Sequence, residues 1–251
     1  MYNDIAGSFS KPIFPNARRR VTLGLFAVTA LAIVLLYFVA QAYFKSIDIE
    51  AAQTRLQLYE RSLNETLSRH QHLPFILAQD RLVKTALEGD NNEPLNKRLE
   101  TFAQQADLEA IYLMDVNGYV LASSNYNLPS SFMNKNYAFR PYFKQSLTGS
   151  RGNYFGIGAT TGRPGYFVSE PVITETGKTA GVMAIKLDAS ELQQSWEQKE
   201  EIVFAVDRNN IVVLASNPEW LYNSTVSLPD DVYSEIINSR QFGNQKIKSL
   251  D

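Results

Sequence analysis

The chain has 251 residues, of which 45% are hydrophobic, which is enough apolar material for a folded core and argues against a disordered segment. It contains no cysteine, which excludes disulfides, thiolate nucleophiles and cysteine-based metal sites. Its 24 basic residues are balanced by 26 acidic residues, so any basic binding site must be local.

An apolar segment without a charged residue covers residues 21–44. At about 1.5 Å per helical residue it is long enough to cross a hydrocarbon core of roughly 30 Å. Its second half contains Tyr37, Phe38, Tyr43 and Phe44, aromatic residues typical of a membrane interface. A cleaved signal peptide would have a shorter apolar region followed by a small-residue cleavage site, so we predict a transmembrane helix.

Basic residues gather before this segment. The first 20 residues contain Lys11, Arg18, Arg19 and Arg20 but only one acidic residue, Asp4. Because such positive charge is retained on the cytoplasmic side, residues 1–20 are predicted to be a cytoplasmic tail and the rest of the chain to be exported. The part after the membrane has 20 basic and 25 acidic residues, which argues against nucleic-acid binding.

A heptad-like stripe continues beyond the membrane segment, at alternating spacings of three and four residues. It consists of Ile49, Ala52, Leu56, Tyr59, Leu63, Thr66 and His70. We predict a stalk helix over residues 45–74, with Pro74 at its end or at a kink. The stripe is expected to pack on the chain's own domain or to form a homodimer through paired stalk helices, and the two arrangements are compatible.

The pattern then changes from helices to strands. Helices are predicted over residues 75–88 and 94–106, and Asn117-Gly118 is a strong signal for a hairpin turn. The predicted strands are 110–115, 119–123, 154–157, 165–173 and 180–187, with further helices near 140–147 and 190–199. Residues 75–200 are therefore expected to form one module with an antiparallel sheet.

Part of this order is repeated. Residues 111–125 resemble residues 203–217, because each has a strand, an Asp-x-Asn turn and a strand that ends in Leu-Ala-Ser. Such a repeat indicates two like-folded modules in tandem. The second, residues 201–251, is expected to be incomplete, with a short helix near 230–239 and one possible strand from Asn244. The predicted fold class is α+β.

Three motifs of the first module indicate its function. They are Tyr137-Ala-Phe-Arg-Pro-Tyr-Phe143, Gly158-Ala-Thr-Thr-Gly162 and the strand that carries Lys186. Together with the membrane anchor and the double module, they resemble the DctB-type C4-dicarboxylate sensor histidine kinases, whose sensor region has a tandem PAS-like, or double Cache, architecture. The resemblance covers most of residues 21–251. Sensor modules of chemoreceptors and diguanylate cyclases carry similar versions of the Arg-Pro-Tyr-Phe run.

The resemblance implies that a small dicarboxylate, such as succinate, fumarate or malate, binds in the membrane-distal module, which here is the first. The implied ligand-binding residues are Tyr137, Arg140, Thr160, Thr161 and Lys186. It also implies a bacterial inner-membrane protein with a periplasmic sensor and a cytoplasmic response regulator as partner. ATP is implied only for a kinase region expected after Asp251, and no cofactor is expected within this chain.

The residue types also suit an anion without the family. A guanidinium offers a planar fork to one carboxylate, and hydroxyls and N–H groups in a glycine-rich turn can receive an anion. Lys186 adds a second cation and should have a partner, since an unpaired buried ammonium is costly. The structural alternatives are Arg140 as a helix cap or the partner of an acidic surface residue, Lys186 on an edge strand, and residues 156–165 as a flexible hairpin loop.

Other polar residues are expected to be structural. Asp115 and Asp207 should stabilise the two hairpin turns rather than take part in catalysis. His70 and His72 are two residues apart and do not share a helix face, so no metal site is expected. We predict a non-catalytic sensor region, and two other functions stay open. One is a chemoreceptor or diguanylate cyclase sensor for another small carboxylate, and the other is an anchored binding protein without signalling output.

Overall fold

In the computed structural model of the chain, the described residues are 15–89, 91–198 and 201–250, with side chains described from residue 19 onward. The predicted cytoplasmic tail, residues 1–20, lies largely outside this described part. The chain divides into two compact units, residues 1–66 and 67–251.

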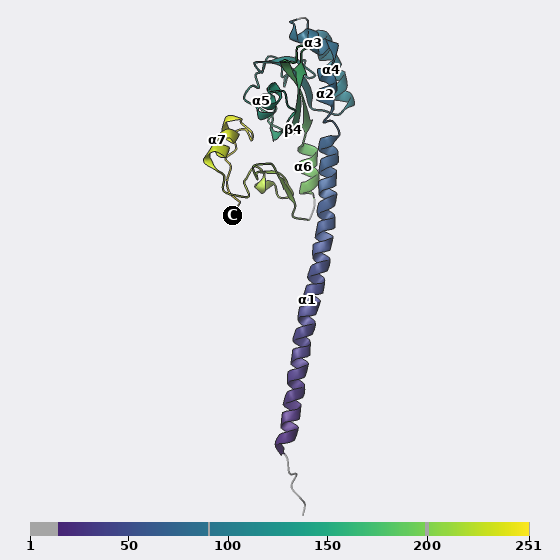
Figure 1. The fold of residues 1–251 in the computed structure, drawn as a ribbon, viewed down its shortest axis with the longest axis vertical. Coiled ribbons are helices and arrows are strands. Elements are labelled where there is room, and N and C mark those ends of the chain that lie inside the picture. The colour runs from purple at the N-terminus through teal and green to yellow at the C-terminus, as the bar shows by residue number, and fades with distance from the viewer. Residues whose placement is uncertain (1–14, 90, 199–200, 251) are drawn as a thin grey trace, which may run out of the picture. The chain divides into compact units, whose positions relative to one another are not determined.

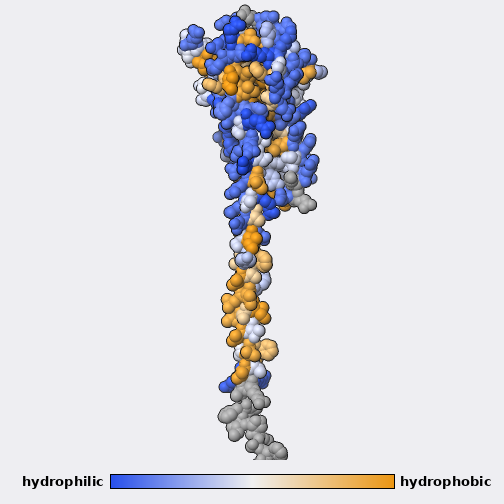
Figure 2. All heavy atoms as spheres, turned by 90° about the vertical axis from the view of Figure 1, so that its right-hand side faces the viewer, coloured by the Kyte–Doolittle hydropathy of each residue, from blue (hydrophilic) through white to orange (hydrophobic). Residues whose placement is uncertain are grey.

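The first unit consists of helix α1 (Pro15–Ser68), which contains the whole predicted membrane segment. The apolar side chains of residues 21–44 are exposed, as for Phe26 and Phe38, which are 75% and 61% accessible. Figure 2 shows them as an orange band along the helix. Among the described residues, α1 is the one helix long and apolar enough to cross a membrane. An uncovered apolar surface of this size is typical of a membrane-spanning helix.

Helix α1 was expected to continue to residue 74, but it ends at Ser68. A turn follows, in which the Gln71 N–H donates to the Ser68 carbonyl. Pro74 then lies in the first turn of a new helix, α2 (Leu73–Ala78). Proline is well suited to that position because the first helical N–H groups have no partner within the helix.

The predicted single helix over residues 75–88 is two helices, α2 and α3 (Arg81–Leu87). Asp80 separates them, because its backbone is extended and its carboxylate accepts a hydrogen bond from the Leu82 N–H at 2.9 Å. This is the geometry of an N-cap, which begins a new helix. Helix α4 (Glu93–Gln105) follows, within a residue of its prediction.

The sheet of the second unit has five antiparallel strands in the order β2-β1-β5-β4-β3. Their bounds are β1 (Ala110–Asp115), β2 (Val120–Ser123), β3 (Gly152–Ile157), β4 (Pro164–Ile173) and β5 (Thr179–Asp188). Each predicted strand is present with ends shifted by two residues at most. Helix α5 (Pro141–Leu147) follows the arginine motif, and α6 (Ser190–Glu197) follows β5.

Each face of this sheet is covered by its own hydrophobic cluster. Helices α2, α3 and α4 cover one face with aliphatic side chains, and α5 lies on the other over a cluster rich in aromatic residues (Figure 1). Alternation along β5 places Ile185 in the first cluster and Ala184 in the second. Lys186 therefore faces the aromatic side, as does Val182.

The C-terminal part has a two-stranded sheet, β6 (Phe204–Val206) and β7 (Val212–Ala215), followed by a 3₁₀ turn, η1 (Pro218–Trp220), and helix α7 (Asp230–Asn238). The strand predicted from Asn244 is wrong. Among the described residues, this region makes only an isolated bridge between Ser249 and Ser224. Pairing partners so distant in sequence cannot be identified from local alternation.

The two repeats share their turn chemistry. Asp115 accepts hydrogen bonds from the N–H groups of Asn117 and Tyr119, at 2.9 and 2.8 Å. Asp207 does the same for Asn209 and Ile211, at 2.8 and 3.0 Å. Both aspartates therefore stabilise hairpin turns, as predicted.

Candidate ligand-binding site

Arg140 is the largest fully buried side chain of the described residues, with 1% of its surface accessible. It precedes α5 with an extended backbone, yet its side chain makes no capping hydrogen bond to that helix. Its guanidinium instead donates to the Ile157 carbonyl at 2.6 Å and to the Tyr154 hydroxyl at 3.2 Å. Arg140 therefore occupies the N-cap position of α5, but its side chain does not cap the helix.

The same guanidinium reaches the C-terminal end of α7. Nη1 of Arg140 donates to the carbonyl oxygens of Ser239 and Arg240, at 3.2 and 2.9 Å. The partners of Arg140 among the described residues are thus three carbonyls and a phenol, all of them neutral. No acidic side chain pairs with Arg140 within that part of the chain, and its buried positive charge is compensated by neutral hydrogen-bond acceptors and by the neighbouring aromatic rings.

Lys186 is also fully buried, but it has a charged partner. Its ammonium lies 2.5 Å from a carboxylate oxygen of Glu109 and donates to the Thr161 hydroxyl at 2.8 Å. Burial lowers the pKa of Lys186, and the Glu109 carboxylate opposes this shift by favouring the charged form. Lys186 lies on β5, which has β1 and β4 on its two sides, so the edge-strand interpretation is wrong.

The glycine-rich loop between β3 and β4 packs tightly against Lys186. A Cβ atom on Gly158 would lie 2.5 Å from Oγ1 of Thr161 and 2.8 Å from Nζ of Lys186. A Cβ on Gly165 would lie 2.5 Å from Cε of Lys186. Distances below 3.0 Å essentially never occur for real Cβ atoms, so a larger residue at either glycine would require the Lys186 or Thr161 side chain to shift. Close packing around the Lys186 ammonium therefore explains the two glycines, whether or not residues 156–165 are also a flexible loop.

The loop is also fastened to the arginine motif. The hydroxyl groups of Tyr137 and Thr160 lie 2.7 Å apart in hydrogen-bond contact. Burial raises the pKa of Tyr137, which keeps the phenol protonated and able to donate at neutral pH. Thr160 and Thr161 thus join opposite sides of the site, one to Tyr137 and the other to Lys186.

The structure brings all five predicted residues into one region. The Phe167 ring lies near both cations, with its centroid 6.0 Å from Cζ of Arg140 and 5.8 Å from Nζ of Lys186. The two cations are therefore at most about 12 Å apart. Two buried cations with one acidic partner give the region an excess of positive charge, which suits an anion. No ligand contact has been tested, so the roles of the five residues stay predictions.

Comparisons with known proteins place this architecture in a family. A family model described as Cache domain matches residues 40–248. The chain belongs to the Cache domain family. Among solved structures, this Cache domain is similar to the V. cholerae histidine kinase DctB sensor domain, with 32% identity and a TM-score of 0.72. That match covers 80% of this chain and 79% of the other.

Two curated relatives are C4-dicarboxylate transport sensor proteins DctB. The protein from Rhizobium meliloti strain 1021 is 30% identical over 249 residues, and the one from Pseudomonas aeruginosa is 29% identical over 240 residues. These matches cover 96% and 92% of this chain but only 40% and 39% of the relatives. The chain thus spans about two fifths of their length, and its resemblance to the DctB sensor region is confirmed.

Sequence reasoning missed several residues of this Cache domain site. Glu109 immediately precedes β1, and its neighbour Ala110 pairs with Lys186 across the β1–β5 ladder. Only the strand register could have revealed this ion pair. No sequence pattern could have identified the Ser239 and Arg240 carbonyls as partners of Arg140, because they are backbone groups about 100 residues away.

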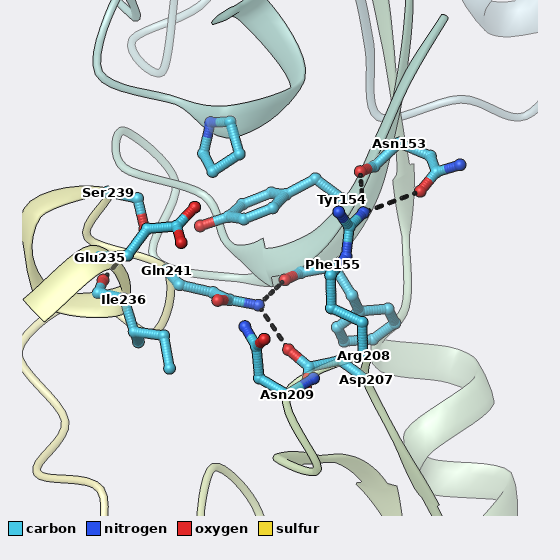
Figure 3. A pocket seen from close by; sticks show the side chains of 11 residues that line it. Asn153, Tyr154, Phe155, Asp207, Arg208, Asn209, Glu235, Ile236, Ser239 and Gln241 are labelled. Atoms are coloured by element: carbon cyan, nitrogen blue, oxygen red, sulfur yellow. Dashed lines mark hydrogen bonds between the residues drawn. The ribbon is translucent and has the colours of Figure 1, made fainter. Parts of the chain in front are cut away.

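A cavity of about 370 Å³ lies beside this region, between β3 and the C-terminal segments of the Cache domain. Figure 3 shows Tyr154, Glu235 and Arg208 among its lining side chains. None of the five predicted residues lines it. Tyr154 nevertheless connects the cavity to the predicted site, because its hydroxyl accepts the hydrogen bond from Arg140.

Proposed function

We propose that this chain senses C4-dicarboxylates outside the cytoplasm and transmits the signal to a histidine kinase of a two-component system. The observation that carries this proposal is the buried Arg140, whose described hydrogen-bond partners are all neutral. A buried cation without an anionic partner is costly, and a ligand carboxylate would remove that cost. The named function of the DctB relatives supports the same ligand class.

Two carboxylates can be accommodated because the site offers two cations. Arg140 would hold one carboxylate with its planar fork, and Lys186 with Thr161 would hold the other. Tyr137 and Thr160, which already share a hydrogen bond, would donate hydroxyl groups from the side. The aromatic cluster around Phe167 would exclude water and strengthen these charge-assisted contacts.

The partners follow from the same proposal. Helix α1 would cross the bacterial inner membrane once and hold the Cache domain in the periplasm. The longer protein would bind ATP in its kinase region and phosphorylate a cytoplasmic response regulator. Paired stalk helices would form the homodimer, since the heptad-like stripe from Ile49 to Thr66 lies on α1.

Calorimetry on the whole chain in detergent micelles tests the ligand class. We expect succinate, fumarate or malate to bind at least tenfold more tightly than butyrate, which lacks the second carboxylate but keeps the four carbons. Equal affinity for succinate and butyrate would mean that one carboxylate is read and that the two-ended site is wrong. No binding of any dicarboxylate would reject the proposed function.

One observation favours a second candidate, an α-amino acid. The Glu109 carboxylate lies beside the site, and while Oε2 contacts the Lys186 ammonium, the buried Oε1 accepts no hydrogen bond among the described residues. It could receive a ligand ammonium while Arg140 held the carboxylate. Tight binding of L-alanine with no binding of succinate, in the same titration, would support this candidate over the dicarboxylate.

A further inference from the structure

Gln241 connects three segments of the Cache domain. Its carbonyl accepts a hydrogen bond from the Ile157 N–H at 2.8 Å, which attaches it to the end of β3. Its side-chain Nε2 donates to the Phe155 carbonyl at 2.9 Å and to the Asp207 carboxylate at 2.8 Å (Figure 3). The residue is 5% exposed. The segment after α7 is thereby fixed both to the first sheet and to the β6–β7 turn.

The sequence is adapted to this close approach. A Cβ atom on Gly156 would lie 2.7 Å from the Gln241 carbonyl oxygen, so the contact requires glycine on β3. Arg240 has a φ of +50°, in the left-handed region that commonly ends helices. This conformation turns the chain so that the carbonyls of Ser239 and Arg240 meet the Arg140 guanidinium. A helix C-terminus carries partial negative charge, which favours a cation there.

The donors of Arg140 are divided between the fold and the site. Its hydrogen bonds to described residues start from Nη1 and Nη2, and those to the α7 end use Nη1. The Nε–H and one of the two N–H groups of Nη2 therefore have no acceptor among the described residues and are available to a ligand carboxylate. Because the guanidinium is planar, fixing Nη1 also fixes the direction in which Nε–H points. The neutral carbonyls of Ser239 and Arg240 thus orient the guanidinium without neutralising its positive charge, which would attract the anion.

We propose that Gln241 is a positioning residue for the anion site, and that docking of the α7 end orients Arg140 and so strengthens ligand binding. This inference rests on the proposed function, which supplies the anion. Thermodynamic linkage makes this effect reciprocal. If docking of the α7 end increases ligand affinity by some factor, ligand binding stabilises the docked α7 end by the same factor. The C-terminal module would thus respond to a ligand held mainly by the first module.

The test uses the whole chain in detergent micelles and two matched substitutions. Gln241→Glu keeps the size of the side chain but removes the Nε2 donor and places a carboxylate beside Asp207. Gln245→Glu makes the same chemical change four residues later, where the side chain is exposed. We expect Gln241→Glu to weaken succinate binding about 5- to 50-fold and Gln245→Glu to leave it unchanged. Calorimetry gives both affinities.

Hydrogen exchange in the wild-type chain supplies a readout that needs no variant. The Gln241 N–H donates to the Ile236 carbonyl at 3.0 Å, and the Ile157 N–H donates to Gln241. We expect saturating succinate to slow exchange of both amides, and Gln241→Glu to abolish that slowing. Unchanged or faster exchange with ligand, or wild-type affinity in Gln241→Glu, would overturn the inference while leaving the proposed function intact.

Failure of the proposed function has a different signature. If the wild-type chain binds neither dicarboxylate nor amino acid, the titration is flat for every variant, and both the function and the link to a ligand are rejected. The docking contact is still measured in that case, because Gln241→Glu should speed exchange at Ile157 without any ligand. Equal exchange in both proteins would reject the docking contact as well.

Discussion

Arg140 and Lys186 are both buried cations, but their charges are compensated in different ways. Lys186 forms an ion pair with Glu109, whereas the described partners of Arg140 are neutral oxygens. An anion therefore gains most at Arg140, where no carboxylate has to be displaced. Lys186 is better suited to set the length and orientation of a ligand than to supply most of its binding energy.

Substitution of Arg140 by lysine keeps the charge but removes the planar fork. We expect Arg140→Lys to weaken succinate binding by about 30-fold or more, because a charge-assisted pair in a desolvated site contributes on the order of 2 kcal/mol or more. Calorimetry measures this loss, with Arg98→Lys, a half-exposed arginine on α4, as control. Unchanged affinity in Arg140→Lys would move the ligand away from this residue.

The Glu109–Lys186 pair can be tested through stability. Lys186→Met leaves the Glu109 carboxylate buried without its cation, and should lower the free energy of unfolding by about 3 kcal/mol. Adding Glu109→Gln removes the remaining charge and should recover most of the loss. Urea unfolding followed by tryptophan fluorescence reports on the second unit, which contains Trp196 and Trp220. Equal losses in the single and double variants would contradict the pairing.

Two buried tyrosines of the aromatic cluster predict that the stability of the fold decreases at alkaline pH. The hydroxyls of Tyr112 and Tyr142 are 2.7 Å apart, and burial raises the pKa of both above the ordinary value of 10.0. The folded state keeps these protons while the unfolded state loses them, so stability is complete below pH 10 and falls as pH rises above it. The slope approaches about 1.4 kcal/mol per pH unit for each fully buried tyrosine.

Tyr142→Phe should make this decline shallower by removing one such group. Burial lowers the pKa of Lys186, which acts in the opposite direction below 10.5, so variant and wild type are compared at the same pH. Urea unfolding at pH 9, 10 and 11 provides the measurement. Parallel declines in the two proteins would assign the alkaline instability to other groups.

At the level of secondary-structure elements, the local sequence pattern was enough to predict most helices and strands. Alternation and the Asn117-Gly118 turn predicted the strands of the first sheet closely, because each strand pairs across a buried surface that the pattern reflects. The break at Asp80 was missed, although the residue is a good N-cap, because apolar spacing continues across it. The strand expected from Asn244 is wrong because, among the described residues of this segment, Ser249 alone forms a β-bridge, and its partner is the distant Ser224.

The Asp80 cap provides a test at this scale. Asp80→Ala removes the oxygen that accepts from the Leu82 N–H and should cost about 1 kcal/mol of stability. Asp80→Asn retains a capping oxygen and loses only the ion pair with the half-exposed Arg98, which contributes little. Urea unfolding of the two variants should therefore separate them, and equal losses would argue that the ion pair dominates.

For the whole molecule, the sequence predicted the membrane helix and the region of the site, but not how the site is completed. The five site residues came from a resemblance; in the structure Arg140 and Lys186 lie near Phe167, Thr161 contacts Lys186, and Tyr137 contacts Thr160. Glu109, Tyr154 and the carbonyls of α7 could not be predicted, because strand register and chain turns decide their positions.

The orientation of the chain in a membrane follows from its charges. Arg18, Arg19 and Arg20 directly precede the apolar segment of α1, so the residues after the membrane should be exported. An enzyme reporter that is active only outside the cytoplasm should be active when fused after Asp251. Activity of a reporter that functions only inside the cytoplasm would reverse the predicted orientation.

The hydrogen bonds from Arg140 to Ser239 and Arg240 span 99 and 100 positions of the chain. During synthesis the first sheet, through β5, is available well before these partners exist. Contacts of such long sequence separation form late in folding, because a large loop must close first. A chain still being exported would therefore carry Arg140 without the α7 carbonyls, and the proposed anion site would be complete only when the chain through Arg240 has reached the far side of the membrane.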